Sequence, residues 1–196
     1  MRKHLITHLE LKDTLDPIVG DGATWVGPYS PEFVTIENRS GLKFSGNGYV
    51  KLSPKLFESV NDETGFTFST WVFVEAGQSV WERIFDFGSS EGAPSVFLTR
   101  NFRATLSGFG DLVADASKAY KENTWIHLAY VYTPTDRARN SSAGGRVYIN
   151  GQLVGEGLIN QTTSGLFGQL KNWTKTLEDP SLYNQNYLGH SQYEAD

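Results

Sequence analysis

The sequence of 196 residues has no cysteine, no long apolar run and no excess of basic charge. The lack of cysteine excludes disulfides and thiolate metal sites, and it leaves the cellular compartment open because a large core needs no covalent staple. A formal net charge of −5 gives no electrostatic footprint for nucleic acid or for an anionic membrane surface. We therefore expect neither a nucleic-acid partner nor membrane insertion.

The N-terminal segment, MRKHLITHLEL, begins with basic residues, as a targeting signal would. Its apolar run is short, however, and His4, Thr7 and His8 interrupt it. A signal peptide or a transmembrane span needs a longer uninterrupted apolar stretch. We expect neither here, so an exported protein would have lost its signal or would carry this region inside a longer chain.

Helical periodicity is also scarce, whereas apolar and polar residues alternate in many short segments separated by turn residues. This pattern predicts an all-β fold, an antiparallel two-sheet sandwich or jelly roll, formed by one domain over residues 1–196. Only residues 53–60 (SPKLFESV) favour one or two helical turns. The predicted strands are residues 5–11, 41–46, 49–53, 66–76, 83–89, 95–100, 103–108, 112–116, 124–133, 145–150, 152–157 and 183–191.

Three segments rich in Gly, Pro, Asp, Asn or Ser, residues 11–33, 133–145 and 159–185, are predicted to be long ordered loops. Two of the strands are apolar on both faces, and such strands are covered on both sides in folded proteins. Trp71 and Trp125 lie on the second faces of these strands. We predict them to be core aromatics under the long loops, with a ligand platform as the alternative.

The stretch GGRVYINGQLVGEG predicts a β-hairpin with its turn at Asn150-Gly151, because both residues accept the positive φ of a two-residue type I′ turn. Read in order, FTFSTWVFV, RIFDFGSS, NTWIHLAYVYT, this hairpin and NYLGHS resemble the laminin-G-like branch of the concanavalin A-like lectin and glucanase superfamily. The resemblance covers about Leu5 to Ser191. It implies a two-sheet sandwich whose concave face or rim loops bind glycans or proteins, often with calcium, and it makes the hairpin part of the framework.

The chain differs from this family pattern in one respect. Domains of this type continue past the NYLGHS-like strand into a closing strand with a Gly-x-aliphatic-Asp pattern, whereas this chain continues only to QYEAD. We expect either an excerpt of a larger protein or a sheet edge completed by another subunit.

The residues do not form the motifs of the common enzyme classes. Retaining glucanases carry two carboxyl groups about 5–5.5 Å apart on one strand, as in Glu-x-Asp-x-x-Glu, and the sequence lacks this motif. Asp86 is alone on its strand, and the histidines are scattered without zinc-ligand spacing. We therefore predict a protein that is not an enzyme.

Calcium is the ion that the loops favour, because hard cations take carboxylates and backbone carbonyls. Asp16 and Asp21 are the predicted ligands, with Asp13, Asp111 and Asp115 as further candidates and solvated loop acids as the alternative. For a glycan, the aromatic residues of the predicted loops offer stacking surfaces, with packed loop anchors as the alternative. These residues are Trp25, Tyr29, Trp81 and Trp173.

The predicted function is a non-catalytic carbohydrate-binding or adhesion module that binds a glycan or a surface protein. Its expected location is extracellular, on a cell surface or on a virion, within a larger protein. The alternative is a structural or protein–protein interaction domain that binds no sugar and contacts another subunit through the unfinished sheet edge.

Overall fold

The computed structural model describes residues 5, 7–58, 60, 65–77, 81–90, 95–101, 103–106, 111–113, 120–133, 144–158 and 184–193. Within these ranges the chain forms strands and turns and no helix, which confirms the predicted all-β class. The strands are β1 (His8–Leu9), β2 (Pro17–Val19), β3 (Thr24–Val26), β4 (Glu32–Ile36), β5 (Arg39–Lys43), β6 (Tyr49–Leu52), β7 (Phe66–Phe73), β8 (Arg83–Gly88), β9 (Val96–Thr99), β10 (Arg103–Leu106), β11 (Asp111–Val113), β12 (Trp125–Thr133), β13 (Gly144–Ile149), β14 (Gln152–Leu158) and β15 (Gln185–Leu188).

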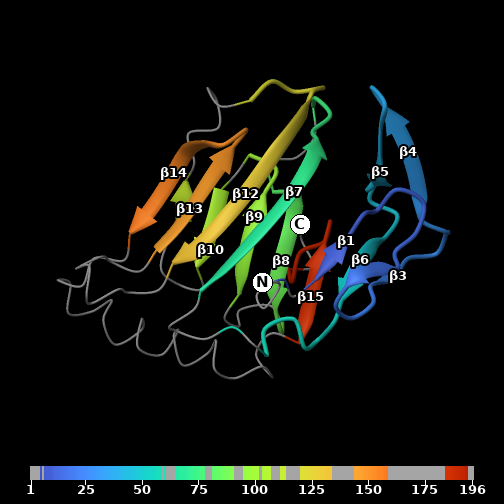
Figure 1. Cartoon of the computed structure of the whole chain (residues 1–196), viewed down its shortest axis with the longest axis horizontal. Coiled ribbons are helices and arrows are strands. Elements are labelled where there is room, and N and C mark those ends of the chain that lie inside the picture. Colours follow the sequence, from blue (N-terminus) through green and yellow to red (C-terminus); the bar gives the residue numbers. More distant parts are fainter. Residues whose placement is uncertain are drawn as a thin grey trace.

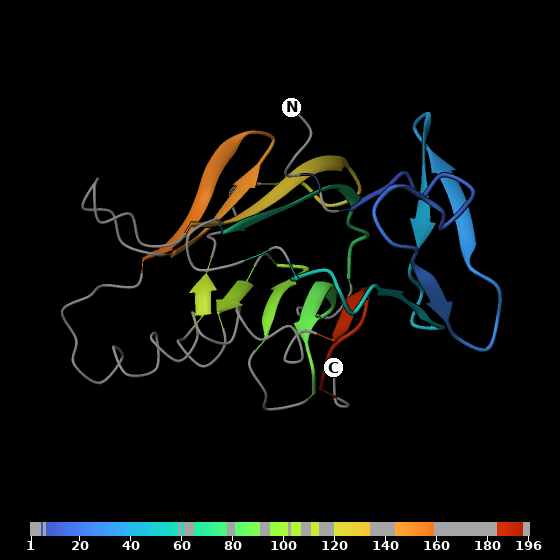
Figure 2. The ribbon, with the colours of Figure 1, turned by 60° about the horizontal axis from the view of Figure 1, so that its bottom comes forward.

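Two antiparallel sheets form a sandwich, seen as an upper and a lower layer in Figure 2. A seven-stranded sheet has the order β11-β10-β9-β8-β15-β6-β3, and a four-stranded sheet has the order β14-β13-β12-β7. The pairs β1-β2 and β4-β5 form two small separate sheets. Figure 1 shows the β4–β5 hairpin standing to one side of the sandwich, near the C-terminal end of β7.

The core lies between the two sheets and is built from alternate residues of their strands. In β12 the side chains of Ile126, Leu128, Tyr130 and Tyr132 are buried, whereas the residues between them are only partly buried. This is the alternation that the sequence predicts. The opposing core side chains from the seven-stranded sheet are Val50, Leu52, Phe85, Phe87, Val96, Leu98, Ala104 and Leu188.

The first predicted loop is corrected by the structure, because residues 11–33 contain the strands β2 and β3. These strands have three residues each, which is too short for any alternation to be seen in the sequence. β3 forms because it adds to the exposed edge of β6, with Trp25 opposite Val50. The helical turns predicted at residues 53–60 are instead successive i to i+3 turns, in which the Leu56 amide donates to the Ser53 carbonyl at 3.2 Å.

The β4–β5 hairpin was predicted only in its second strand. Its turn has positive φ at two non-glycine residues, 48° at Glu37 and 64° at Asn38. A Glu-Asn pair is a weak turn signal beside Asn-Gly, since only the asparagine readily adopts this conformation. The sequence pattern therefore did not predict the first strand or the turn of this hairpin.

The Asn150-Gly151 turn confirms the prediction, with φ of 51° and 81° at its two residues. It also holds the neighbouring strand: the Asn150 amide donates to the His127 carbonyl at 2.8 Å, and the His127 amide donates to Asn150 Oδ1 at 2.9 Å. The asparagine side chain thus extends the β12–β13 ladder by one hydrogen bond beyond the end of β13.

Gly151→Val is expected to lower the free energy of unfolding by about 1–3 kcal/mol, because a β-branched residue is forced to positive φ. A Cβ at Gly151 would meet nothing within 4 Å, so the loss would come from the backbone alone. Gly22→Val is the matched control, since its Cβ would also meet nothing within 4 Å and its φ is not positive. Urea unfolding followed by tryptophan fluorescence checks this, and equal losses in the two variants would contradict it.

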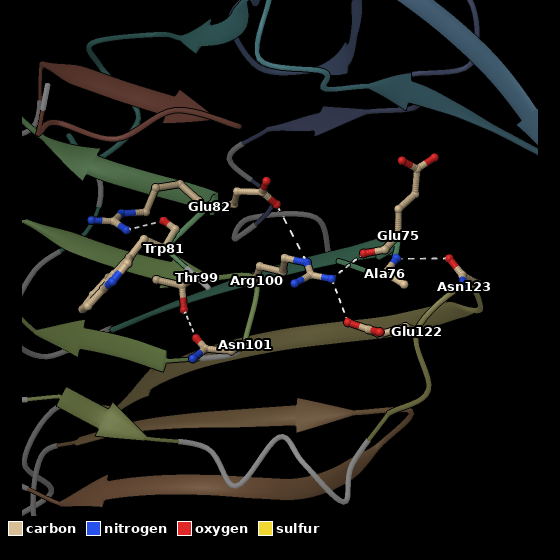
Figure 3. Close-up of polar contacts among 10 residues, drawn as sticks. Glu75, Ala76, Trp81, Glu82, Thr99, Arg100, Asn101, Glu122 and Asn123 are labelled. Atoms are coloured by element: carbon tan, nitrogen blue, oxygen red, sulfur yellow. Dashed lines mark hydrogen bonds and ion pairs between the residues drawn. The ribbon is translucent and has the colours of Figure 1, made fainter. Parts of the chain in front are cut away.

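Two arginines of the seven-stranded sheet are held by hydrogen bonds and ion pairs. Arg100, just after β9, reaches the ends of β7 and β12 in the other sheet, where Nη2 donates to the Glu75 carbonyl and to Glu122 Oε1 (Figure 3). Arg83 forms a buried ion pair with Asp86, with Nε 3.3 Å from Oδ2. Arg83 Nη1 also donates to the Trp81 carbonyl at 2.6 Å.

Candidate functional site

The face of the four-stranded sheet that points away from the core combines aromatic and hydrogen-bonding side chains. The alternation that buries Phe68 and Leu128 inward turns Ser69 and Trp71 of β7 and His127 of β12 outward. Tyr148 of β13 and Leu153 of β14 lie opposite each other in the next two strands. We call the set of Arg39, Ser69, Trp71, His127, Tyr148 and Leu153 the Trp71 surface.

Trp71 is the most prominent aromatic side chain of this surface, with 47% of its area exposed. It lies directly opposite His127 in the β7–β12 ladder, and the two ring centroids are 5.3 Å apart at an interplanar angle of 62°. His127 Nε2 is 2.9 Å from Ser69 Oγ, a hydrogen bond that holds the imidazole beside the indole. The predicted burial of Trp71 in the core is therefore wrong, since its side chain is half exposed.

The β4–β5 hairpin supplies the remaining side chain of the surface. The guanidinium carbon of Arg39 lies 3.9 Å from the centroid of the Trp71 ring, which is a cation–π contact. The hairpin is fastened to the sandwich by Trp125, whose Nε1 donates to the Ile36 carbonyl at 2.9 Å. Trp125 is partly buried beneath this hairpin, so it is covered as predicted, but by a strand pair and not by a long loop.

The far end of the Trp71 surface lies over β13 and β14. Leu153 is 50% exposed at the edge strand, beside Tyr148. One row further along the sheet, Arg146 Nε binds Glu156 Oε2 at 3.0 Å, and Nη1 donates to Thr133 Oγ1 at 3.2 Å. Glu156 is thus already neutralised by an arginine on its own sheet, and the surface beside it presents hydroxyl, imidazole and guanidinium groups.

Of the first two aromatic residues predicted for glycan binding, Trp25 lies in β3 and Tyr29 in the loop after it. Trp25 Nε1 donates to the Tyr29 carbonyl at 2.6 Å, and the Trp25 ring packs against Phe44 with centroids 6.3 Å apart. Trp25 is therefore fastened in place and only partly exposed. The Tyr29 side chain is 69% exposed. A binding role for either residue stays a prediction.

Trp81 precedes β8 and is 41% exposed. The Arg83 guanidinium lies 6.0 Å from the Trp81 ring centroid and 4.1 Å from that of Phe97. Trp81 thus belongs to the opposite sheet from Trp71, and the structure does not bring the predicted aromatics together on one surface. Trp173 lies outside the described residues.

The predicted calcium ligands lie in the first part of the chain and are exposed. Asp16 Oδ2 accepts a hydrogen bond from Thr14 Oγ1 at 2.8 Å, and Asp21 Oδ2 accepts one from Ser53 Oγ at 2.7 Å. Calcium takes six to eight oxygen ligands. Among the described residues, no group of three or more His, Cys, Asp or Glu side chains could hold a metal ion, and calcium binding by these two carboxylates stays a prediction.

On the seven-stranded sheet, His190 stacks on Tyr49 with ring centroids 4.1 Å apart and packs against Tyr187. Burial lowers the pKa of His190, because a partly dry environment disfavours the charged imidazolium. Burial therefore favours the uncharged imidazole in this aromatic cluster, and Tyr187 is buried within it. It contributes packing at this end of the sheet.

A family model described as "Concanavalin A-like lectin/glucanases superfamily", of the Laminin_G_3 type, matches residues 44–177, which is more than half of the chain. The chain belongs to this superfamily. The match spans the strands from β6 to β14 and therefore includes β7 and β12, which carry Trp71 and His127.

A solved structure with the same fold is domain 4 of AbnA, a GH43 extracellular arabinanase from Geobacillus stearothermophilus, in complex with arabinotriose. It aligns with a TM-score of 0.61 and 14% sequence identity, over 96% of this chain and 84% of that one. A search of curated proteins gave no match. Among the described residues, no helix is long and apolar enough to cross a bilayer.

The Trp71 surface was not assigned from the sequence, although one signal for it was present. Trp71 and Trp125 alternate with core residues in the sequence, a pattern that allows a ligand platform as the alternative to core packing. The two tryptophans differ in exposure because the β4–β5 hairpin covers Trp125 and leaves Trp71 about half exposed. Arg39 carries no local signal, because its partner is 32 residues away in the chain.

Proposed function

We propose that this chain is a non-catalytic carbohydrate-binding module and that it binds an oligosaccharide on the Trp71 surface. The observation that carries the proposal is the half-exposed indole of Trp71 beside hydrogen-bonding side chains on the outward face of a sheet. Sugar-binding sites combine an apolar stacking surface with a few placed polar groups. The proposal is supported by membership of a lectin-like superfamily and by the structural similarity to a domain that binds arabinotriose.

The chemistry of the surface suits a pyranose or furanose ring. The C–H groups on one side of a sugar ring are apolar and pack against an indole, while its hydroxyl groups need donors and acceptors. Ser69 Oγ and His127 Nε2 lie next to the indole and can exchange hydrogen bonds with such hydroxyls. Tyr148 and Leu153 continue the surface across β13 and β14, which leaves room for more than one sugar unit.

The absence of catalysis is part of the proposal. Glycoside hydrolysis needs two carboxyl groups on either side of one glycosidic bond. The Trp71 surface as defined includes no Asp or Glu, and the neighbouring Glu156 binds Arg146. The buried Asp86 is paired with Arg83 on the other sheet. These arrangements favour binding without cleavage.

Trp71→Ala is expected to weaken binding of an oligosaccharide such as arabinotriose by about tenfold, because the stacked ring contributes on the order of 1–1.5 kcal/mol. Calorimetric titration of the wild type and the variant measures this. Trp81→Ala and Tyr29→Ala are the matched controls, since each removes an exposed ring elsewhere on the molecule and should leave the affinity unchanged. Loss of binding in either control with Trp71→Ala unaffected would place the site on the loops, as the sequence predicts.

The alternative function is a structural or protein-interaction domain. It is favoured by the exposed Leu153 on β14, which is an edge strand of the four-stranded sheet. Concentration-dependent self-association in sedimentation, lost in Leu153→Lys, together with no response to any sugar, would support this alternative. An extracellular, cell-surface or virion-surface location is part of the glycan-binding proposal, and secretion of the parent protein would test it.

Calcium binding by the first loop is a separate proposal with its own measurement. An ion held by Asp16 and Asp21 would bind the folded state and stabilise it by about 2.7 kcal/mol at a hundredfold excess over its dissociation constant. The melting temperature should then rise in calcium, fall again in chelator, and no longer respond in Asp21→Ala. Identical melting curves in calcium and in chelator would leave both residues as hydrogen-bonding loop acids.

A further inference from the structure

Arg39 holds its charged group over the Trp71 ring, at 3.9 Å from the centroid, and its side chain is exposed. Among the described residues it makes neither an ion pair with a carboxylate nor a side-chain hydrogen bond. Glu37, two residues away at the tip of the same hairpin, is not paired with it in this part of the chain. The guanidinium is therefore positioned by the indole, and its donors are free of the other described side chains.

The hairpin that presents Arg39 is well ordered by its own contacts. Its two strands pair in register from Glu32 opposite Lys43 to Ile36 opposite Arg39. Thr35 Oγ1 and Ser40 Oγ are hydrogen-bonded at 2.9 Å, and the Trp125 indole binds the Ile36 carbonyl. Because the cation is attached to this fastened element, little freedom remains to be lost when a ligand binds it.

The N–H groups of a guanidinium point outward in the plane of the group, so they stay accessible when its face packs on an aromatic ring. There they can bind a carboxylate through two parallel hydrogen bonds. Such a group beside a sugar-stacking indole matches a sugar that has a carboxylate on its ring. The attraction to a carboxylate comes from this one guanidinium, because the protein as a whole has a net charge of −5 and would otherwise repel anionic chains. His127, whose ring centroid lies 5.3 Å from that of the indole, adds a further donor.

We propose that the sugar unit bound at Trp71 is a uronic acid and that Arg39 binds its carboxylate. This inference rests on the proposed carbohydrate-binding function and names the class of sugar for the same surface. Trp71 provides the stacking contact and Arg39 the charge-assisted hydrogen bonds, so the two residues contribute separately to affinity and to the choice of sugar.

The test is calorimetric titration of the full chain with trimers of galacturonic acid and of glucuronic acid, each compared with its methyl ester. The ester has the same ring and hydroxyls but no charge. At least one acid trimer should bind about tenfold more tightly than its ester. Arg39→Gln should abolish the preference for the acid over its ester, whereas Trp71→Ala should weaken binding of both. Added salt should weaken binding of the acid only.

Lys43→Gln is the control, because it removes the same charge from the other end of the same hairpin and should leave the preference for the acid intact. Melting curves of the variants verify that the hairpin change has not unfolded the protein. Equal affinity for acid and ester, a preference that survives Arg39→Gln, or binding of arabinotriose without either acid trimer would overturn the inference and leave the carbohydrate-binding function standing. Binding of none of these sugars would overturn both.

Discussion

Asp86→Ala is expected to reduce the free energy of unfolding by about 3–5 kcal/mol, because it removes one partner of a buried ion pair. The side chains of Arg83 and Asp86 are 2% and 0% exposed, and Nε lies 3.3 Å from Oδ2. The carboxylate also accepts a hydrogen bond from the Gln192 amide at 3.1 Å, which fastens the segment after β15 across β8. Urea unfolding followed by tryptophan fluorescence measures the loss.

Two further variants separate the charge from the hydrogen bonds. Asp86→Asn keeps an acceptor of the same size for Arg83 and Gln192, and it should lose less stability than Asp86→Ala. The double variant Arg83→Met with Asp86→Leu should recover part of the loss, because a matched apolar pair removes both desolvated charges. A loss below about 1 kcal/mol in Asp86→Ala would show that the pair behaves like an exposed one.

Arg100→Met is expected to cost about 2–3 kcal/mol of the free energy of unfolding, since it removes charge-assisted hydrogen bonds that join the two sheets. Arg100 is buried, and its Nη2 donates to Glu122 Oε1 at 2.8 Å and to the Glu75 carbonyl, while Nε lies 3.8 Å from Glu82 Oε2 (Figure 3). Methionine keeps most of the apolar stem, so the loss reports mainly on the guanidinium. Amide hydrogen exchange should also accelerate at the ends of β7 and β12.

Arg146→Met is the matched control for this prediction. Arg146 pairs with Glu156 within one sheet, and both side chains are partly exposed to solvent. Such pairs contribute about 0–1 kcal/mol. Similar losses in the two variants would mean that the contacts between the sheets add nothing to those within a sheet.

For Asp86, the sequence predicted the strand but not the contacts of the side chain. Its strand was predicted, and the lack of a second carboxylate on that strand argued against a glucanase. That Asp86 is buried against Arg83 and receives the amide of Gln192, 106 positions further along the chain, could not be predicted. The partner amide belongs to a segment that reaches β8 only once β15 has inserted between β8 and β6.

The sequence alone determined the features that depend on a few consecutive residues. Alternation over residues 66–73 and 125–133 set which side chains enter the core, and Asn150-Gly151 set a turn that needs positive φ. Only the tertiary structure decided that Trp125 is covered and Trp71 half open, and that Arg39 lies on the Trp71 ring. Those outcomes depend on how the β4–β5 hairpin packs against a sheet formed much later in the chain, and packing between distant segments leaves no local pattern in the sequence.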